Sequence, residues 1–271
     1  MYHLIAFDMD GTLLNSHKEI SPTTQEAIRE ASLAGKEVVL STGRALSELA
    51  DYLPDLPCVH YGILASGAVL CDFQNQTVLQ KTPIPIDLAL NLATYARQGQ
   101  VMVLAMKDGQ GYLQRSHLET IERFHVSHYR QLYEKTAVLV DNIYDFVEEH
   151  AGDLEKINLY HQTANARDAG YEVLLSDRLA VVKAEQSGLE FTAAGVHKGA
   201  GLDQLCDLLG LSIAATIAVG DADNDREILV QAGLGLAMGN ASDDIKTLAD
   251  HILPTNDQDG CVRAITDYLL Q

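Results

Sequence analysis

Short apolar runs that end directly in polar clusters place the strongest constraint on the fold of this chain. Residues 4–7 run into DMDGT at residues 8–12, and residues 215–219 run into GDADND at residues 220–225. Strands that are apolar on both faces are typical of parallel sheets covered by helices. In such open sheets, ligands bind beyond the carboxyl ends of the strands. The pattern therefore predicts an α/β fold with a functional site at one edge of its sheet.

The segment between these runs predicts repeated strand–helix units. Ser21 and Pro22 are typical of a helix start, and Gly35 is typical of a helix end. Residues 36–40 form the next predicted strand, and a further helix is expected over residues 44–53. Strands that alternate with helices at this spacing indicate parallel pairing.

The middle of the chain has a different pattern. From about Pro83 onward, amphipathic helices are mixed with short strands, including residues 155–161 and 179–183. The strand–helix alternation returns after residue 187. We therefore predict a core domain with a parallel sheet and an inserted α+β domain, with the core formed by residues 1–82 and 188–271 and the insert by residues 83–187.

The acidic composition narrows the possible partners. The 271-residue chain has a formal net charge of −19 and a pI of about 4.7, which repels nucleic acid and anionic membranes. It also repels a phosphate ester, so a phosphate site must be made locally positive by a metal ion, lysine, arginine or backbone N–H groups. The N-terminus has no signal-peptide pattern, no apolar run approaches about 20 residues, and no cysteines are paired in a CxxC motif. These features predict a cytoplasmic protein without a membrane partner.

Asp8 and Asp10 directly follow the first predicted strand. Because side chains alternate along a strand, two carboxylates two residues apart can point into the same cavity. One can then attack a substrate while the other transfers a proton. Gly11 lets the backbone approach a ligand closely. The alternative for this motif is a turn closed by an Asp side chain ahead of a helix.

Two further segments offer groups for binding phosphate. The hydroxyl of Thr42, the backbone of Gly43 and the guanidinium of Arg44 suit phosphate oxygens at a turn from strand to helix. Lys198 stands between two glycines ahead of a predicted helix and can place a point charge on a phosphoryl group. Each segment has a simpler alternative, namely a helix cap for the first and a solvated surface lysine for the second.

The acidic segment at residues 220–225 predicts a magnesium site. Mg²⁺ prefers oxygen ligands and keeps several waters, so one or two carboxylates suffice to bind it. Asp221 comes first after the strand and is placed to be a ligand, while Asn224 and Asp225 are placed to orient it. The alternative is a solvated acidic helix start, which the helix dipole favours.

Together these motifs resemble those of the haloacid dehalogenase superfamily of phosphatases. The matching segments are DMDGTLL at residues 8–14, STGR at 41–44, GVHKG at 195–199, GDADND at 220–225 and AMGNA at 237–241. The insertion between the second and third motifs is similar to the Cof-type branch, whose cap domain is of the C2B type. The resemblance spans the whole chain. One departure is Ser66, because the family often has asparagine at that place near the substrate.

The resemblance implies a Rossmann-like core with a specificity-determining cap at residues 83–187. It implies a Mg²⁺-dependent phosphatase that acts through an aspartyl-phosphate on Asp8, with Asp10 as general acid and base. The Asp8 carboxylate, the Asp10 backbone carbonyl and Asp221 would hold the metal, with Asp225 behind them. The implied phosphate-binding residues are Thr42, Gly43, Arg44, Lys198 and Asn224. The expected substrate is a small phosphorylated metabolite, with sugar phosphates first.

Two other functions remain open from the sequence. A phosphomutase uses the same aspartyl-phosphate but returns the phosphoryl group to another hydroxyl. A non-catalytic binding protein on the same fold is the second possibility. The intact set of Asp8, Asp10, Lys198 and Asp221 speaks against it, because a protein without catalysis has no reason to keep all four.

Overall fold

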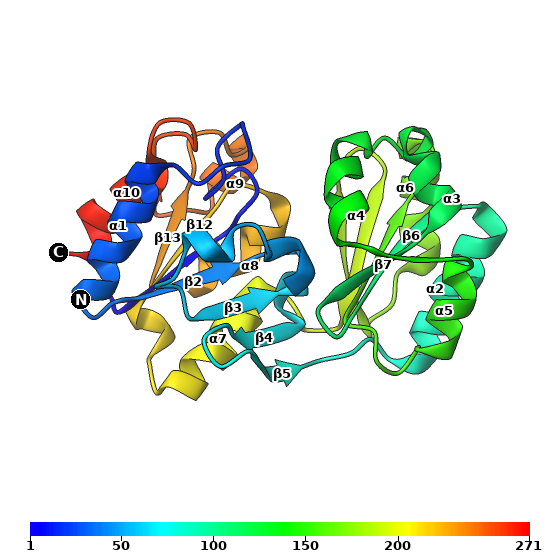
Figure 1. Ribbon diagram of the computed structural model, residues 1–271, viewed down its shortest axis with the longest axis horizontal. Helices are drawn as coiled ribbons and strands as arrows, with labels where there is room; N and C mark the ends of the chain where they lie inside the picture. The colour runs from blue at the N-terminus through cyan, green and yellow to red at the C-terminus, as the bar shows by residue number, and fades with distance from the viewer. The chain divides into compact units, whose positions relative to one another are not determined.

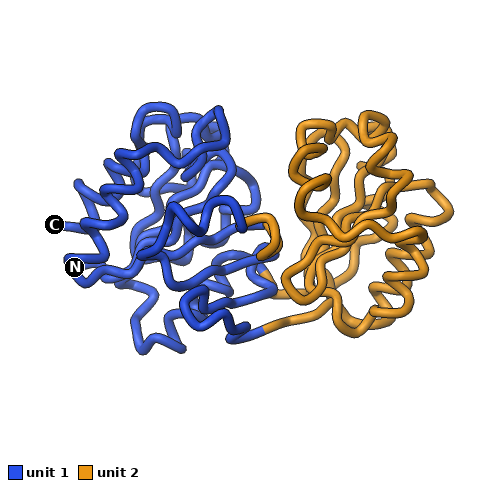
Figure 2. The backbone as a smooth tube through the Cα atoms, viewed as in Figure 1, with its two compact units in different colours: residues 1–43, 50–80, 197–271 blue, residues 44–49, 81–196 orange.

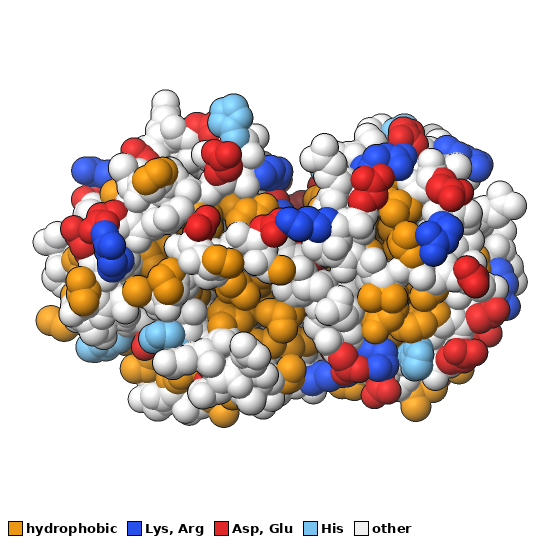
Figure 3. Space-filling view, in the orientation of Figure 1, with side chains coloured by type: hydrophobic (Ala, Val, Ile, Leu, Met, Phe, Trp, Pro, Cys, Tyr) orange, Lys and Arg blue, Asp and Glu red, His pale blue; other side chains and the backbone are white.

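Two sheets organise the chain, each at the centre of its own unit (Figures 1 and 2). A computed structural model describes all 271 residues. Unit 1 comprises residues 1–43, 50–80 and 197–271, and unit 2 comprises residues 44–49 and 81–196. The helices all fall short of the length and apolar character that crossing a membrane requires. Acidic, basic and apolar side chains are interspersed over the face seen in Figure 3. The predicted α/β class is confirmed.

The sheet of unit 1 is mainly parallel and has eight strands. The strand β1 lies between β12 and β2, with Leu4 opposite both Thr216 and Glu37. The strand β4 runs antiparallel to its neighbour β3. The parallel pairing brings the residues after β1 and β12 to one edge of the sheet. In sheet order the strands are β14 (His251–Ile252), β13 (Leu234–Ala237), β12 (Thr216–Gly220), β1 (Leu4–Phe7), β2 (Glu37–Ser41), β3 (Tyr61–Leu64), β4 (Val69–Asp72) and β5 (Thr77–Lys81).

Helices cover both faces of this sheet (Figure 1). The first helix starts as predicted, since the Ser21 hydroxyl accepts a hydrogen bond from Thr24 N at 3.2 Å and Pro22 occupies the first turn. On the other face, Leu202 and Leu205 of α7 pack into a buried cluster with Ile228 of α8. The helices of unit 1 are α1 (Pro22–Leu33), α7 (Lys198–Leu209), α8 (Arg226–Gln231), α9 (Asp243–Lys246) and α10 (Gly260–Ala264), with short turns η2 (Leu53–Asp55), η3 (Ala65–Gly67), η6 (Ile213–Ala215), η7 (Asp223–Asp225) and η8 (Ile265–Leu269).

The helix expected over residues 44–53 is not formed. The chain makes only the 3₁₀ turn η1 (Leu46–Leu49), followed by η2. The carboxylate of Glu48 accepts a hydrogen bond from Ala45 N at 2.7 Å within this single turn. Pro54 has no N–H to donate and therefore limits a helix from the other side.

Unit 2 contains a six-stranded sheet in the order β10-β11-β9-β6-β7-β8. Its pairings are antiparallel except that β7 and β8 run parallel. One face packs against α2, α5 and α6 through a buried apolar cluster. The strands are β6 (Met102–Lys107), β7 (Gln110–Gln114), β8 (Val138–Val140), β9 (Lys156–Tyr160), β10 (Leu179–Ala184) and β11 (Gly188–Ala193). The helices are α2 (Ile86–Gly99), α3 (Arg115–Glu119), α4 (Arg130–Thr136), α5 (Ile143–Glu149) and α6 (Ala164–Leu174), with turns η4 (Ile121–Phe124) and η5 (Ser127–Tyr129).

The limits of the second unit differ from the range 83–187 expected from the sequence. The strand β11 pairs with β10 and β9, from Leu179 opposite Ala193 to Ala184 opposite Gly188. It therefore belongs to the second sheet, and unit 2 continues to Val196. Gly188 is the first residue of β11, which is the second strand of a hairpin with β10. The sequence pattern had instead predicted that the chain returns to the core domain at this point. The short segment at residues 44–49 also belongs to unit 2.

Candidate active site

A buried lysine joins two of the carboxylates at the edge of the unit 1 sheet. Lys198 is the first residue of α7 and is completely buried. Its Nζ donates to Asp8 Oδ1 and to Asp225 Oδ1, each at 2.6 Å. The side chain of His197 accepts from Ala200 N at 3.1 Å and caps the helix, which fixes the start of α7 beside the sheet. Lys198 thus orients Asp8 through one oxygen and leaves the other carboxylate oxygen for chemistry.

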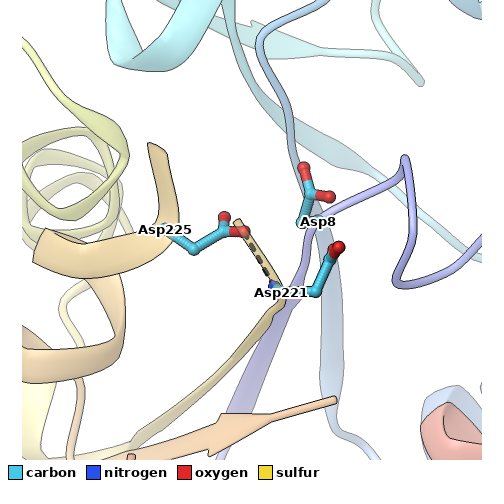
Figure 4. A group of neighbouring side chains, drawn as sticks. All are labelled: Asp8, Asp221 and Asp225. Carbon is cyan, nitrogen blue, oxygen red and sulfur yellow. Dashed lines mark hydrogen bonds between the residues drawn. The ribbon is translucent and has the colours of Figure 1, made fainter. Parts of the chain in front are cut away.

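Asp221 and Asp225 complete the group shown in Figure 4. Asp225 Oδ2 accepts from Asp221 N at 3.0 Å and from Ala222 N at 3.1 Å. Both oxygens of Asp225 are therefore already engaged, by Lys198 and by the backbone. Asp221 Oδ1 accepts from the hydroxyl of Thr12 at 2.7 Å. Asp225 is placed to orient this loop, whereas Asp8 and Asp221 each retain an oxygen for a ligand.

The electrostatics of the group show that its negative charge is only partly balanced. Burial raises the pKa of Asp8 well above its ordinary value; Lys198 opposes the shift, and Asp225 and Asp221 reinforce it. Burial also raises the pKa of Asp221 to about 6, against the opposing hydrogen bond from Thr12. Burial alone would lower the pKa of Lys198, but the charges of Asp225 and Asp8 outweigh it and raise this pKa. Lys198 therefore stays cationic while the carboxylates repel one another.

This donor set fits a divalent cation. Ligand oxygens of Asp8, Asp221 and Asp225 all lie within 4.8 Å of one another. Hard cations such as Mg²⁺ bind carboxylate oxygens and commonly use only one or two of them in a protein site. A cation between Asp8 and Asp221 would also offset the cost of burying these negative charges, which is the main cause of the raised pKa of both carboxyls. The position of Asp221 first after β12 agrees with the ligand role expected for it.

Asp10 lies at the rim of the same edge. Its side chain is 31% exposed and accepts a hydrogen bond from Lys18 Nζ at 2.9 Å. The backbone turns back at once, since Asp10 forms a bridge with Leu14. A partly exposed carboxyl two residues from Asp8 can exchange protons with a bound group or with water, which is what its expected role as general acid and base requires.

The other residues predicted to bind phosphate lie in different surroundings. Thr42 N already donates to Ile63 O at 2.8 Å, so its backbone N–H is engaged within the sheet. Arg44 falls in unit 2, where its guanidinium donates to Glu48 O at 3.3 Å. Oδ1 of Asn224 is buried without a hydrogen-bond partner. These roles, with that of Gly43, stay predictions.

Three residues near the site were not predicted to act there. Thr12 binds Asp221, and Lys18 binds Asp10, as described above. Asn240 Nδ2 donates to Gly11 O at 2.8 Å, and Asn240 Oδ1 accepts from Asn256 N at 3.1 Å. Thr12 and Asn240 lie within motifs that the sequence did single out, but their hydrogen-bond partners lie far away in the chain. Lys18 has no motif signal of its own.

Gly11 provides a test of this geometry. Its φ is +83°, and a Cβ there would lie 2.3 Å from Asp221 Oδ2. Gly11→Ala is expected to lower kcat about a hundredfold, because small displacements of reacting groups are that costly. Gly35→Ala is the matched control, since Gly35 has a φ of +73° with nothing within 4 Å of the added Cβ. Steady-state kinetics and urea unfolding of both variants check this. Equal kinetic effects would show that backbone strain alone is responsible.

Comparison with known proteins confirms the family that the sequence motifs resemble. A family model described as haloacid dehalogenase-like hydrolase matches residues 5–265. The chain is 29% identical over 274 residues to 5-amino-6-(5-phospho-D-ribitylamino)uracil phosphatase YcsE of Bacillus subtilis (strain 168), covering 98% of this chain and 96% of that protein. It is 26% identical over 278 residues to pyridoxal phosphate phosphatase YbhA of Escherichia coli (strain K12), covering 98% of each. A solved haloacid dehalogenase-like hydrolase from B. subtilis is similar with a TM-score of 0.86 and 28% identity, covering 98% of this chain and 99% of that one.

Proposed function

The protein belongs to the haloacid dehalogenase-like hydrolase family, and from this membership we propose that it is a Mg²⁺-dependent phosphatase acting through an aspartyl-phosphate on Asp8. The observation that carries the proposal is the buried Lys198, which binds one oxygen of Asp8 and holds that carboxylate at the sheet edge. A nucleophile, a fixed cation and a second metal-ligating carboxylate, Asp221, stand together there. This set is what phosphoryl transfer requires, because its catalysis is mainly positioning and charge stabilisation.

In the first step, the free oxygen of Asp8 attacks phosphorus while the bond to the leaving oxygen breaks. Asp10 gives its proton to that leaving oxygen. Lys198 remains charged throughout, because its raised pKa resists deprotonation. In the second step, water attacks the aspartyl-phosphate, Asp10 takes the water proton, and Asp8 is regenerated as phosphate leaves.

Mg²⁺ would be held by the carboxylates of Asp8 and Asp221 and by the backbone carbonyl of Asp10. When bound, it supplies the positive charge that lets an anionic nucleophile approach an anionic ester. Thr42, Lys198 and Asn224 would bind the oxygens of the transferring group. Thr12 and Asp225 keep Asp221 in place through the hydrogen bonds already described.

Metal binding should be visible in stability as well as in activity. An acid whose pKa is higher in the folded state binds protons more tightly when folded, so Asp221 makes the metal-free protein less stable as the pH rises from 3.8 to about 6. Metal binding requires the deprotonated carboxylates. Mg²⁺ is therefore expected to raise Tm more at about pH 7.5 than at about pH 5.

Thermal unfolding with Mg²⁺ or with EDTA measures this shift. The Asp221→Asn variant is expected to lose most of it, and EDTA is expected to abolish wild-type turnover until Mg²⁺ is restored. An undiminished Tm shift in Asp221→Asn, or full activity in EDTA, would exclude the metal site assigned to Asp8 and Asp221.

The role of Asp10 predicts a dependence on the leaving group. A general acid matters most when the leaving oxygen is a poor leaving group. Asp10→Ala is expected to lose about a hundredfold or more in kcat on an alkyl phosphate and about tenfold or less on p-nitrophenyl phosphate. Initial rates on both esters check this. Equal losses would assign Asp10 to the metal site or to the second step only.

Small phosphomonoesters are the proposed substrates, with sugar phosphates first and pyridoxal phosphate or nucleotides behind. The proposal is supported by the names of the relatives, which include a pyridoxal phosphate phosphatase and a phosphatase of a phosphoribityl compound. The net charge of −19 disfavours polyanionic substrates. Selectivity among these esters is assigned to unit 2, because Asp8, Asp10, Lys198 and Asp221 all lie in unit 1.

A panel assay with purified protein and Mg²⁺ tests this function. The expected result is release of phosphate from at least one sugar phosphate with a kcat/KM above that for any phosphopeptide. A phosphopeptide or an oligonucleotide end hydrolysed more efficiently than every sugar phosphate would overturn the substrate class. Turnover that needs an added bisphosphate and forms an isomeric ester would indicate a mutase.

A further inference from the structure

The loop that follows β1 is held by side chains from the far end of the chain. It carries both carboxylates that follow the strand, and it returns at Leu14, which forms a bridge with Asp10. Three carbonyl oxygens of this loop, those of Gly11, Thr12 and Leu14, accept hydrogen bonds from residues 229 to 249 positions away. All of these residues belong to unit 1. We call residues 8–14 the nucleophile loop.

Two asparagine amides supply two of these hydrogen bonds and are joined to each other. Asn240 Nδ2 donates to Gly11 O at 2.8 Å, and Asn256 Nδ2 donates to Leu14 O at 2.9 Å. Asn240 Oδ1 accepts from Asn256 N at 3.1 Å. A backbone N–H can only donate and a backbone carbonyl can only accept, so these partners fix the orientation of the Asn240 amide. A carboxylate in its place could not donate to Gly11 O.

The asparagine pair is anchored at the sheet edge where β12 and β13 end. Met238 N, directly after β13, donates to Gly220 O of β12 at 3.0 Å. Gly239 N donates to Pro254 O at 3.2 Å, which joins the segments that carry the two asparagines. A Cβ on Gly239 would lie 3.1 Å from the carbonyl carbon of Pro254, so these segments are in close contact. The pair therefore ties the nucleophile loop to the strand that positions Asp221.

The backbone, more than packing, has to place the Asp10 carboxyl. The Asp10 side chain is 31% exposed, whereas that of Asp8 is 6% exposed. The residue after Asp10 is Gly11, whose φ is +83°. Glycine has the greatest backbone freedom of all residues, so the hydrogen bond to its carbonyl restricts a rotation that no side chain restricts. The second amide holds the carbonyl of Leu14, the bridge partner of Asp10.

We propose that Asn240 and Asn256 are positioning residues for the general-acid step. They hold the nucleophile loop so that the Asp10 carboxyl gives its proton to the leaving oxygen as the bond from that oxygen to phosphorus breaks. They act through the backbone of this loop and not on the substrate itself. Displacing a reacting group by about 1 Å can lower a rate about a hundredfold. This proposal rests on the phosphatase function proposed above.

Removal of each amide tests the proposal on two esters. Hexyl phosphate has a poor leaving group and depends on the proton from Asp10, whereas p-nitrophenyl phosphate needs little protonation. Asn240→Ala is expected to lower kcat on hexyl phosphate about tenfold or more. On p-nitrophenyl phosphate its kcat should stay within about threefold of wild type. Asn256→Ala should show the same selective loss. A defect in folding alone would lower both rates together.

Asn75→Ala is the matched control. Asn75 is exposed in the turn after β4, and its Nδ2 donates to Asp72 Oδ2 at 2.8 Å, the same length as the bond from Asn240 to Gly11. Because β4 runs antiparallel to β3, its carboxyl end lies at the edge of the sheet opposite to the site. The control should change neither rate.

Circular dichroism and urea unfolding show whether each variant is folded. Asn240 is exposed, so its replacement should cost the fold little, and Asn256→Ala carries the test if Asn240→Ala does not fold. Equal losses on the two esters, or no loss on hexyl phosphate, would overturn the positioning role. If Asp10→Ala shows the selective loss and the asparagine variants do not, this role falls while the phosphatase function stands. If the wild type hydrolyses neither ester with Mg²⁺, both proposals fall.

Discussion

Asp8→Asn is expected to lower kcat by at least about a thousandfold, which corresponds to about 4 kcal/mol in activation free energy. The amide keeps the size of the side chain and can still accept the hydrogen bond from Lys198 that the carboxylate accepts now. It lacks the charge that attacks phosphorus. Folding should be retained, because the change removes a buried negative charge, and burial is the main cause that raises the pKa of Asp8.

Phosphate release and urea unfolding of the same preparation test this expectation. Asp203→Asn is the matched control, since Asp203 is exposed on α7 and makes no contact with the site. The control should turn over like the wild type. A folded Asp8→Asn protein with near-normal turnover would exclude Asp8 as the nucleophile.

Lys198→Met is expected to have the largest combined effect on activity and stability. Methionine fills a similar volume but leaves the carboxylates of Asp8 and Asp225 buried without their cation. Removing one partner of a buried ion pair costs about 3–5 kcal/mol in the free energy of unfolding. Because Asp8 also loses the contact that orients it, kcat should fall at least about a hundredfold.

The pH dependence of unfolding separates this effect from a simple packing defect. Lys198 opposes the shift that burial causes in the pKa of Asp8, so without Lys198 this pKa should rise further. Acids that bind protons more tightly when folded lose stability as the pH rises. The variant should therefore be closer to wild type in stability at about pH 5 than at about pH 7.5.

Two further variants make the test specific. Lys198→Met combined with Asp225→Asn should recover part of the lost stability, because it removes one unpaired charge, but not the activity. Lys246→Met, at the end of α9, makes no salt bridge to lose and serves as the control. A Lys198→Met protein with wild-type stability and turnover would contradict the central place given to Lys198.

The main motifs could be recognised from the sequence because local rules govern them. A strand that is buried on both faces has to be apolar, so the polar residues after residues 4–7 and 215–219 stood out at once. Ser21 and Pro22 likewise marked the start of α1 correctly, since capping depends only on neighbouring residues. The amino-acid sequence was therefore sufficient to single out Asp8, Asp10 and Asp221 as candidates.

Other features depended on contacts that the local sequence does not encode. The helix expected after Arg44 was wrong, because the chain forms only single turns there, and Pro54 in the second turn has no N–H to donate. The sequence predicted that the second unit ends at residue 187, because the residue pattern of β11 is compatible with a strand in either sheet. Only the pairing of β11 with β10 and β9 assigns that strand to unit 2.

By itself, the sequence determined the family and the α/β class and predicted the residues for the chemistry, because each of these is expressed in short motifs. The tertiary structure alone decided how the residues act on one another. Lys198 lies 190 positions from Asp8 in the chain, yet its ammonium binds that carboxylate. It does so because β1 pairs with β12 and α7 packs on the same sheet. The charge balance of the site, and with it the pKa of Asp8 and Asp221, follows from this burial and proximity, which no local pattern records.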